Sequence, residues 1–135
     1  MGCRGRAWRR GAAVAEFAVV APVFFMMIIG FIEFGRALMV QQVLVNASRV
    51  GAREAIIEDA TTSTVTGTVQ DYAEGVSVSG VSVTVTPDPA TADTSDFITV
   101  TVSIGFDDVS WMPTPWFMGG KSLSASSTMR KEGFY

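Results

Sequence analysis

The chain has 135 residues, a formal net charge of −3, no histidine and a single cysteine, Cys3. Histidine is the commonest general base and metal ligand, and one cysteine cannot form an intramolecular disulfide, so this composition argues against most enzymatic and metal-binding classes. Arg4, Arg6, Arg9 and Arg10 precede the first apolar run, and the rest of the chain has six basic and thirteen acidic residues. That acidic balance excludes a nucleic-acid-binding surface, which needs clustered Lys and Arg.

Residues 12–34 are the most apolar segment and are predicted to form a transmembrane helix. Residues 17–32 contain no charged side chain, and the segment can cross a hydrocarbon core of about 30 Å at a rise of about 1.5 Å per residue. A cleaved secretory signal would be shorter and would end in a small-x-small site, which is missing before Glu33. The basic residues 1–11 predict a cytoplasmic leader by the positive-inside rule, with the C-terminal part outside the cytoplasm.

Glu16 is a carboxylate near the start of this apolar helix. A charge at such a depth is costly unless a partner or solvent satisfies it. The residue alone allows two interpretations. It is either solvated at the headgroup boundary without a role, or it pairs with a group from another molecule.

Residues 35–59 are predicted to continue the helix as an amphipathic extension, because they lack proline and repeat apolar residues at helical spacing. The repeating residues are Val40, Val43, Ala47, Val50 and Ala55. Arg36, Arg49 and Arg53 allow two interpretations: solvated side chains on the polar face, or ion pairs with acidic surfaces of neighbouring subunits.

Residues 60–135 are predicted to form a small extracytoplasmic head that begins with a second helix. This helix is expected over residues 62–74, with Val65, Val69, Tyr72 and Ala73 on its apolar face. A cap within Thr61–Ser63 begins it and Gly75 ends it.

Three strands are predicted after this helix. Valines alternate with serines and threonines over 76–85, and Gly80 shifts the phase, which predicts a bulge there. The clearest strand covers 98–104, and its inward residues are Ile98, Val100, Val102 and Ile104. A third strand is placed at 122–130. Three antiparallel strands beside a long helix make an α+β fold in which one sheet face packs on the helix.

Residues 107–120 are predicted to be an irregular loop that contains Trp111 and Trp116. These aromatic side chains either close the open end of a small core or form a contact surface for a partner or the membrane. Asp107 and Asp108 lack the ligand spacing and the glycine of an ordered calcium loop. The sequence therefore predicts no metal site, no cofactor and no catalytic residue.

Four stretches together resemble a known family. The first is Arg9-Arg10-Gly11-Ala12-Ala13-Val14-Ala15-Glu16-Phe17, in which a basic flank and glycine precede small apolar residues, a glutamate and an aromatic residue. The others are Glu33-Phe34-Gly35-Arg36, Asn46 to Arg53, and Met129 to Glu132. This pattern resembles the TadE-like minor pilins, or pseudopilins, of tight-adherence (Tad) pilus systems, most strongly over residues 9–55.

The resemblance implies a pilin-like, non-enzymatic component of pilus biogenesis and adhesion. A prepilin peptidase would cut after Gly11 and leave Ala12 as the new N-terminus. Glu16 and Phe17 would then guide subunit assembly, with Glu16 pairing with the Ala12 amine of a neighbour. Glu33, Arg36, Arg49, Arg53, Trp111 and Trp116 would be candidate inter-subunit contacts.

The expected partners are the prepilin peptidase, other pilus subunits, inner-membrane assembly proteins and membrane lipid. The expected location is the bacterial inner membrane, with passage into an extracellular pilus as an option. The alternative is an unprocessed single-pass protein whose extracytoplasmic head binds a ligand or wall component. A major fibre subunit is disfavoured, because such subunits have almost no head beyond the helix.

Overall fold

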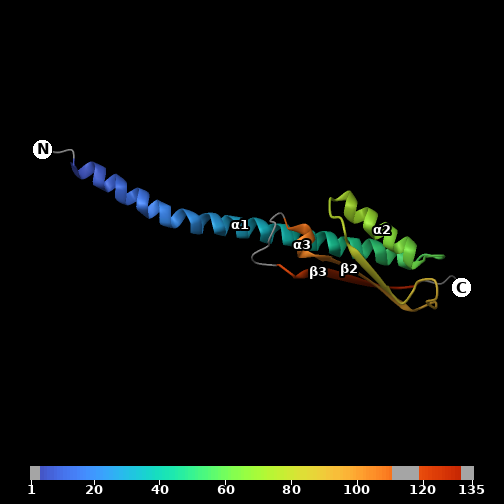
Figure 1. Ribbon diagram of the computed structural model, residues 1–135. Coiled ribbons are helices and arrows are strands. Elements are labelled where there is room, and N and C mark those ends of the chain that lie inside the picture. Colours follow the sequence, from blue (N-terminus) through green and yellow to red (C-terminus); the bar gives the residue numbers. More distant parts are fainter. Residues whose placement is uncertain (1–3, 111–118, 132–135) are drawn as a thin grey trace. The chain divides into compact units, whose positions relative to one another are not determined.

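The computed structural model describes residues 4–110 and 119–131, with side chains described from Gly11 onward. The predictions for Trp111 and Trp116 therefore lie outside the described residues. The chain divides into two compact units, Met1–Gly35 and Arg36–Tyr135. Helix α1, Arg4–Ala55, supplies the described part of the first unit and the beginning of the second (Figure 1).

Helix α1 ends at Ala55, four residues before the predicted boundary at residue 59. The chain then makes a tight turn, in which the amides of Ile57 and Ala60 donate to the carbonyls of Glu54 and Ile57, each at 3.3 Å. Asp59 has a φ of 63°, a left-handed conformation that cannot continue a right-handed helix and that aspartate tolerates better than most residues. The helix was predicted to continue to residue 59 because the segment lacks proline, and the lack of proline does not reveal a turn of this kind.

Helix α2, Thr62–Gly75, begins at the predicted residue with the predicted N-terminal cap, but it includes Gly75, which was expected to end it after residue 74. Thr61 and Thr64 form a reciprocal capping box, in which each side chain accepts a hydrogen bond from the backbone amide of the other residue. At the other end, the amides of Ser77 and Val78 donate to the carbonyls of Glu74 and Ala73. This pattern is a Schellman motif.

The Schellman motif explains why the predicted strand over 76–85 with a bulge at Gly80 is wrong in its first half. Val76 is the C-cap of α2, Ser77 takes the left-handed conformation (φ 63°), and Val78 turns back into the core. Strand β1 therefore covers only Ser82–Thr86. The alternating valines at 76 and 78 reflect a helix end and not a pleated strand.

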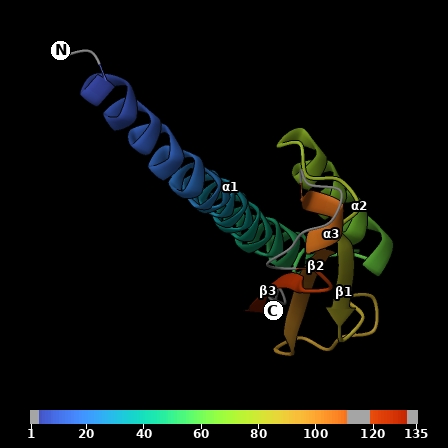
Figure 2. The same cartoon turned by 60° about the vertical axis from the view of Figure 1, so that its left-hand side comes forward.

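Strands β2, Phe97–Gly105, and β3, Ser122–Arg130, lie where the sequence predicts them. The three strands form one antiparallel sheet in the order β1-β2-β3 (Figure 2). The inward residues of β2 are buried as expected: Ile98, Val100, Val102 and Ile104. The α+β fold, a long N-terminal helix packed on a three-stranded antiparallel sheet, is confirmed.

The opposite face of the sheet carries hydroxyl side chains in register across all three strands. Their rows are Thr86, Thr99 and Thr128, then Thr84, Thr101 and Ser126, then Ser82, Ser103 and Ser124. The hydroxyls of Thr99 and Thr128 lie 2.8 Å apart and share a hydrogen bond. This face is the polar side of a sheet that is apolar only towards the helices.

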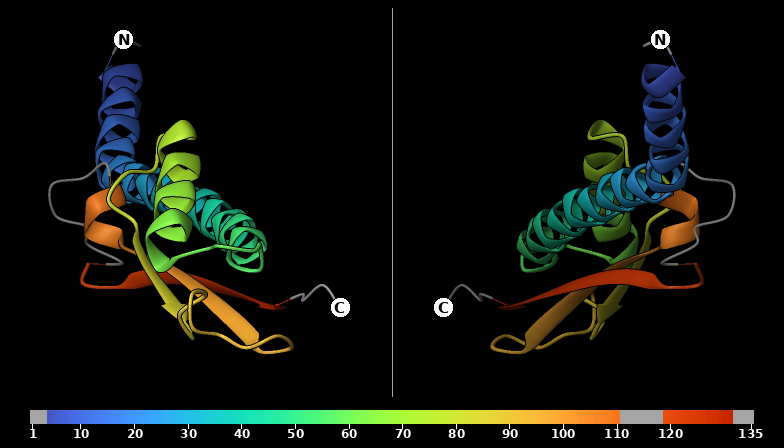
Figure 3. Two further views of the ribbon diagram at one scale, coloured as in Figure 1. Left: turned by 90° about the vertical axis from the view of Figure 1, so that its right-hand side faces the viewer. Right: turned by 90° about the vertical axis from the view of Figure 1, so that its left-hand side faces the viewer.

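The core of the second unit lies between the sheet and the two helices, and both helices lie on the same side of the sheet (Figure 3). The face of α1 that enters this core has small and medium residues, which bring the helix close to its neighbours: Val40, Leu44, Ala47, Ser48, Ala52 and Ala55. Gly51 lies on the same face. A short helix, α3 (Phe106–Val109), begins the segment predicted as an irregular loop, and buries Phe106 and Val109.

Candidate functional site

Over residues 17–32 the surface of α1 is apolar on all sides. Its large side chains are mostly more than half exposed: Val14, Phe17, Val19, Val20, Val23, Phe24, Phe25, Met26, Phe31, Ile32 and Phe34. A helix that is apolar all round must be covered by lipid or by other helices, because water cannot solvate such an area favourably. Within the described part of the chain, one helix, Gly11–Ala55, is long and apolar enough to cross a membrane. The N-terminal helix therefore has the length and composition of a membrane anchor.

The predicted processing and assembly residues lie on this exposed helix. A Cβ added at Gly11 would have no atom within 4 Å, and the Phe17 side chain is 70% exposed. Glu16 is also exposed. Among the residues whose side chains are described, none forms a hydrogen bond or an ion pair with Glu16. The single chain thus leaves this carboxylate for an external partner or for solvent.

Glu33 and Arg36, predicted as inter-subunit contacts, differ in their surroundings. The Glu33 side chain is only 6% exposed. Arg36 is exposed, yet its Nε donates to the backbone carbonyl of Val109 at 2.5 Å. Val109 is the last residue of the short helix α3, so Arg36 ties α1 to α3 within the second unit. Its first role is structural.

Arg49 and Arg53 are both exposed. They lie on the side of α1 opposite Gly51, Ala52 and Ala55, which face the core. The two arginines are at positions i and i+4, so their side chains lie on neighbouring turns of one helix face. Arg36 does not form one cluster with these two arginines, because its guanidinium is hydrogen-bonded to α3.

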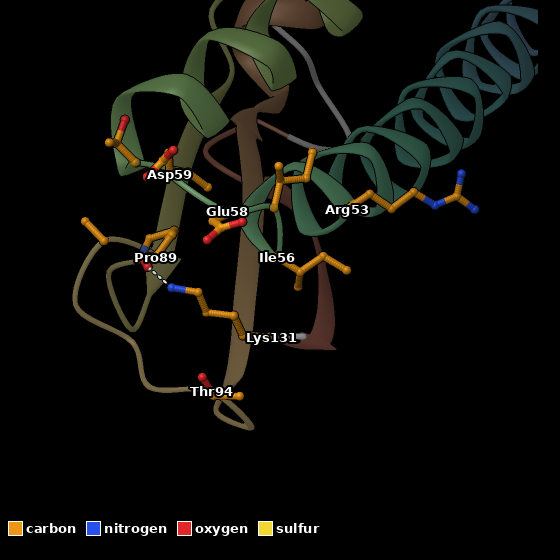
Figure 4. A pocket seen from close by; sticks show the side chains of 11 residues that line it. Arg53, Ile56, Glu58, Asp59, Pro89, Thr94 and Lys131 are labelled. Carbon is orange, nitrogen blue, oxygen red and sulfur yellow. Dashed lines mark hydrogen bonds between the residues drawn. The ribbon is translucent and has the colours of Figure 1, made fainter. Parts of the chain in front are cut away.

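A cleft of about 900 Å³ opens between the turn after α1 and the loop after β1 (Figure 4). Its residues include Arg53, Glu58, Asp59, Thr94 and Lys131. The Lys131 ammonium donates to the carbonyls of Pro89 at 2.6 Å and Ala92 at 3.1 Å, and so holds the loop across the end of the sheet. This cleft is built around a loop-fixing lysine.

Sequence reasoning missed three residues that hold the elements of the second unit together. Gly51 allows α1 to approach α2 and β2, Gln41 donates from its Nε2 to the carbonyl of Ser124 on β3 at 2.9 Å, and Lys131 holds the loop described above. A glycine amid small residues on an amphipathic helix was a usable signal for close packing. The contacts of Gln41 and Lys131 join residues far apart in the sequence, and nothing local marks them.

Comparisons with known proteins locate the similarity on α1. Neither the curated proteins nor the solved structures gave a match. Residues 11–53 match the family model described as TadE-like protein, which confirms the resemblance drawn from Gly11, Glu16 and the Asn46–Arg53 segment. The matched segment comprises the apolar anchor and the part of α1 that packs in the core. The chain is therefore similar to TadE-like proteins over this N-terminal segment, which is less than half of its length.

Proposed function

We propose that the chain is a minor pilin or pseudopilin of a Tad-type pilus, made as a precursor and cut after Gly11 by a prepilin peptidase. Residues 1–11 are the cytoplasmic leader, 12–34 the transmembrane helix, 35–59 its extension and 60–135 the extracytoplasmic head. Residues 12–34 anchor the protein in the lipid of the bacterial inner membrane until other subunits and inner-membrane assembly proteins draw it into a fibre.

The observation that carries this proposal is the all-round apolar surface of α1 around an unpartnered Glu16, within the segment that matches the TadE-like family. Once lipid is exchanged for neighbouring helices, that carboxylate sits in a low dielectric and needs a counter-charge. Cleavage after Gly11 creates one, because it frees an ammonium at Ala12. The amine of one subunit and Glu16 of the next satisfy each other, so processing and assembly are coupled.

The test is the intact mass and N-terminal sequence of the protein purified from its native membrane or pilus fraction. We expect a product that begins at Ala12. The variant Gly11→Leu should stay at full length, and the matched variant Gly35→Leu should be cut normally, because Gly35 lies outside the cleavage motif. A wild-type product that keeps Met1 to Gly11 would overturn the proposal and favour an unprocessed, anchored binding domain.

Glu16 is tested separately from cleavage. The variant Glu16→Gln keeps the size and most of the polarity of the side chain but removes its charge. We expect it to be cut normally and to fall out of the pilus fraction into the membrane fraction. Normal incorporation of Glu16→Gln would show that the carboxylate has no pairing role.

A further inference from the structure

Two exposed pairs of opposite charge lie on different helices of the second unit. On α1, no acidic residue occurs between Arg36 and Arg53, so the side that carries Arg49 and Arg53 is basic. On α2, Thr62–Gly75 contains no lysine or arginine, and Asp71 and Glu74 are exposed. The chain therefore has a basic strip on one helix and an acidic strip on the other.

Both strips point away from the core. Asp71 and Glu74 are exposed, whereas Val65, Val69 and Ala73 on the other side of α2 are buried. Arg49 and Arg53 are likewise opposite the buried face of α1. None of the four charged side chains forms an ion pair or a side-chain hydrogen bond with another described residue. Their charges are free for an external partner.

We propose that the basic strip of α1 (Arg49 and Arg53) binds the acidic strip of α2 (Asp71 and Glu74) of a second copy of this chain. The inference rests on the proposed function, in which copies meet in the membrane and the fibre. Charge complementarity identifies the occupant, because one chain carries both halves of the contact and uses neither internally.

The spacing of the two strips supports simultaneous pairing. Residues three or four apart on a helix have Cβ atoms about 5–6 Å apart, so two arginines on one helix can meet two carboxylates on another. Each exposed ion pair is weak by itself. Anchoring by α1 concentrates the copies in one membrane, so that weak and specific contacts become sufficient to set their register.

This contact is heterologous, because it joins different surfaces of the two copies. A heterologous contact leaves one strip unused on each end copy, and so it continues into a ring or an open fibre and does not stop at a dimer. The contact thus gives the head a part in fibre growth. It adds to the pairing of Glu16 with Ala12, which involves only the N-terminal helix.

Cross-linking of full-length chains in native membranes tests the heterologous geometry. In a Cys3→Ser background, Asn46→Cys marks the basic side of α1 and Gln70→Cys marks α2 beside Asp71; both positions are exposed. A mixture of the two single variants should yield cross-linked dimers with a short bismaleimide, and each variant alone should not. A chain with both substitutions should yield a ladder of oligomers. Dimers from Asn46→Cys alone would overturn the proposal, since they indicate an α1–α1 contact.

Charge reversal tests the chemistry. Arg49→Glu with Arg53→Glu on the Asn46→Cys copy should lower the mixed-dimer yield about tenfold. Adding Asp71→Lys and Glu74→Lys to the Gln70→Cys copy should restore it, which also shows that both variants fold. The matched control, Asp93→Lys with Asp108→Lys, reverses two exposed acids away from both strips and should leave the yield unchanged. A yield that is insensitive to reversal at Arg49 and Arg53 would overturn the contact.

The N-terminal mass of the same samples separates this inference from the proposed function. Chains that begin at Ala12 but show no charge-dependent mixed dimer would refute the contact alone. Chains that keep Met1 yet form the mixed dimer would refute pilin-type processing and leave the contact in place.

Discussion

Gly51 of α1 faces Val69 of α2 so closely that a Cβ added to the glycine would lie 2.5 Å from Cγ2 of the valine. The same added atom would lie 3.0 Å from Cγ1 of Val100 on β2. One missing methyl group therefore lets α1 touch both α2 and the sheet. The fold depends on this approach because the core is small.

Gly51→Ala should destabilise the head. Alanine gains up to about 1 kcal/mol over glycine in a helix, but overpacking costs about 1–3 kcal/mol, and the two β-branched valines cannot turn away freely. We expect the free energy of unfolding to fall by about 1–2 kcal/mol, read from hydrogen exchange of the β2 amides in the full chain in detergent. Gly67→Ala is the control: its Cβ would meet nothing within 4 Å, so it should stabilise. Equal stability of Gly51→Ala and the wild type would contradict the packing argument.

Arg36→Lys should loosen α3. The substitution keeps the positive charge but removes the Nε–H that donates to the Val109 carbonyl. A hydrogen bond from a charged donor contributes about 1.5–3 kcal/mol, and a lysine recovers only part of this. We expect faster hydrogen exchange of the Ser110 amide, which donates to Phe106 at 2.8 Å, while exchange in α2 stays unchanged. Slower or unaltered exchange at Ser110 would refute this role for Arg36.

Thr61→Ala should weaken the start of α2. The Thr61 hydroxyl accepts from the Thr64 amide at 3.2 Å, and the Thr64 hydroxyl accepts from the Thr61 amide at 3.0 Å. Loss of an N-cap costs about 0.5–2 kcal/mol. We expect the free energy of unfolding, measured with denaturant, to fall by about 1 kcal/mol. The control Ser63→Ala, two residues further on and outside the capping box, should be about as stable as the wild type. A double variant with Thr64→Ala should lose less than the two single losses together.

Lys131→Met should release the loop after β1 without unfolding the sheet. Methionine matches the length of the lysine stem but cannot donate to Pro89 and Ala92, which the ammonium holds now. We expect limited proteolysis between Pro87 and Asp96 to quicken several-fold. Lys121→Met, at the other end of β3, serves as the control and should leave cleavage in this loop at the wild-type rate.

The elements that sequence predicts well are those specified by neighbouring residues. The alternation of Ile98, Val100 and Val102 with threonines defined β2, because inward and outward positions differ in polarity. Thr61 defined the start of α2, because a cap acts over one helical turn. Such features can be read without knowing the fold.

The elements that sequence predicts poorly depend on a residue's backbone conformation or on a distant partner. Val76 and Val78 have the pattern of a strand, but the left-handed Ser77 between them completes a helix end. Asp59, in the turn that follows α1, takes the same kind of conformation. The candidate site follows this division: the apolar helix was predicted from the sequence, whereas the hydrogen bond of Arg36 to the end of α3 was not.

The rows of hydroxyl side chains on the outer sheet face also affect whether heads at high local concentration aggregate through their sheets. The Lys121 carbonyl accepts from the Phe106 amide, and the Lys131 amide donates to the Asp96 carbonyl, so the backbone groups of these odd-numbered residues face β2. Because the direction alternates along a strand, the even-numbered residues of β3 direct their backbone groups to the free edge. Gln41 covers the carbonyl of Ser124 at that edge by donating a hydrogen bond to it. Hydrated hydroxyls and guarded edges discourage sheet-to-sheet aggregation. The strands thus provide solubility at high local concentration, and specific association is left to the helices.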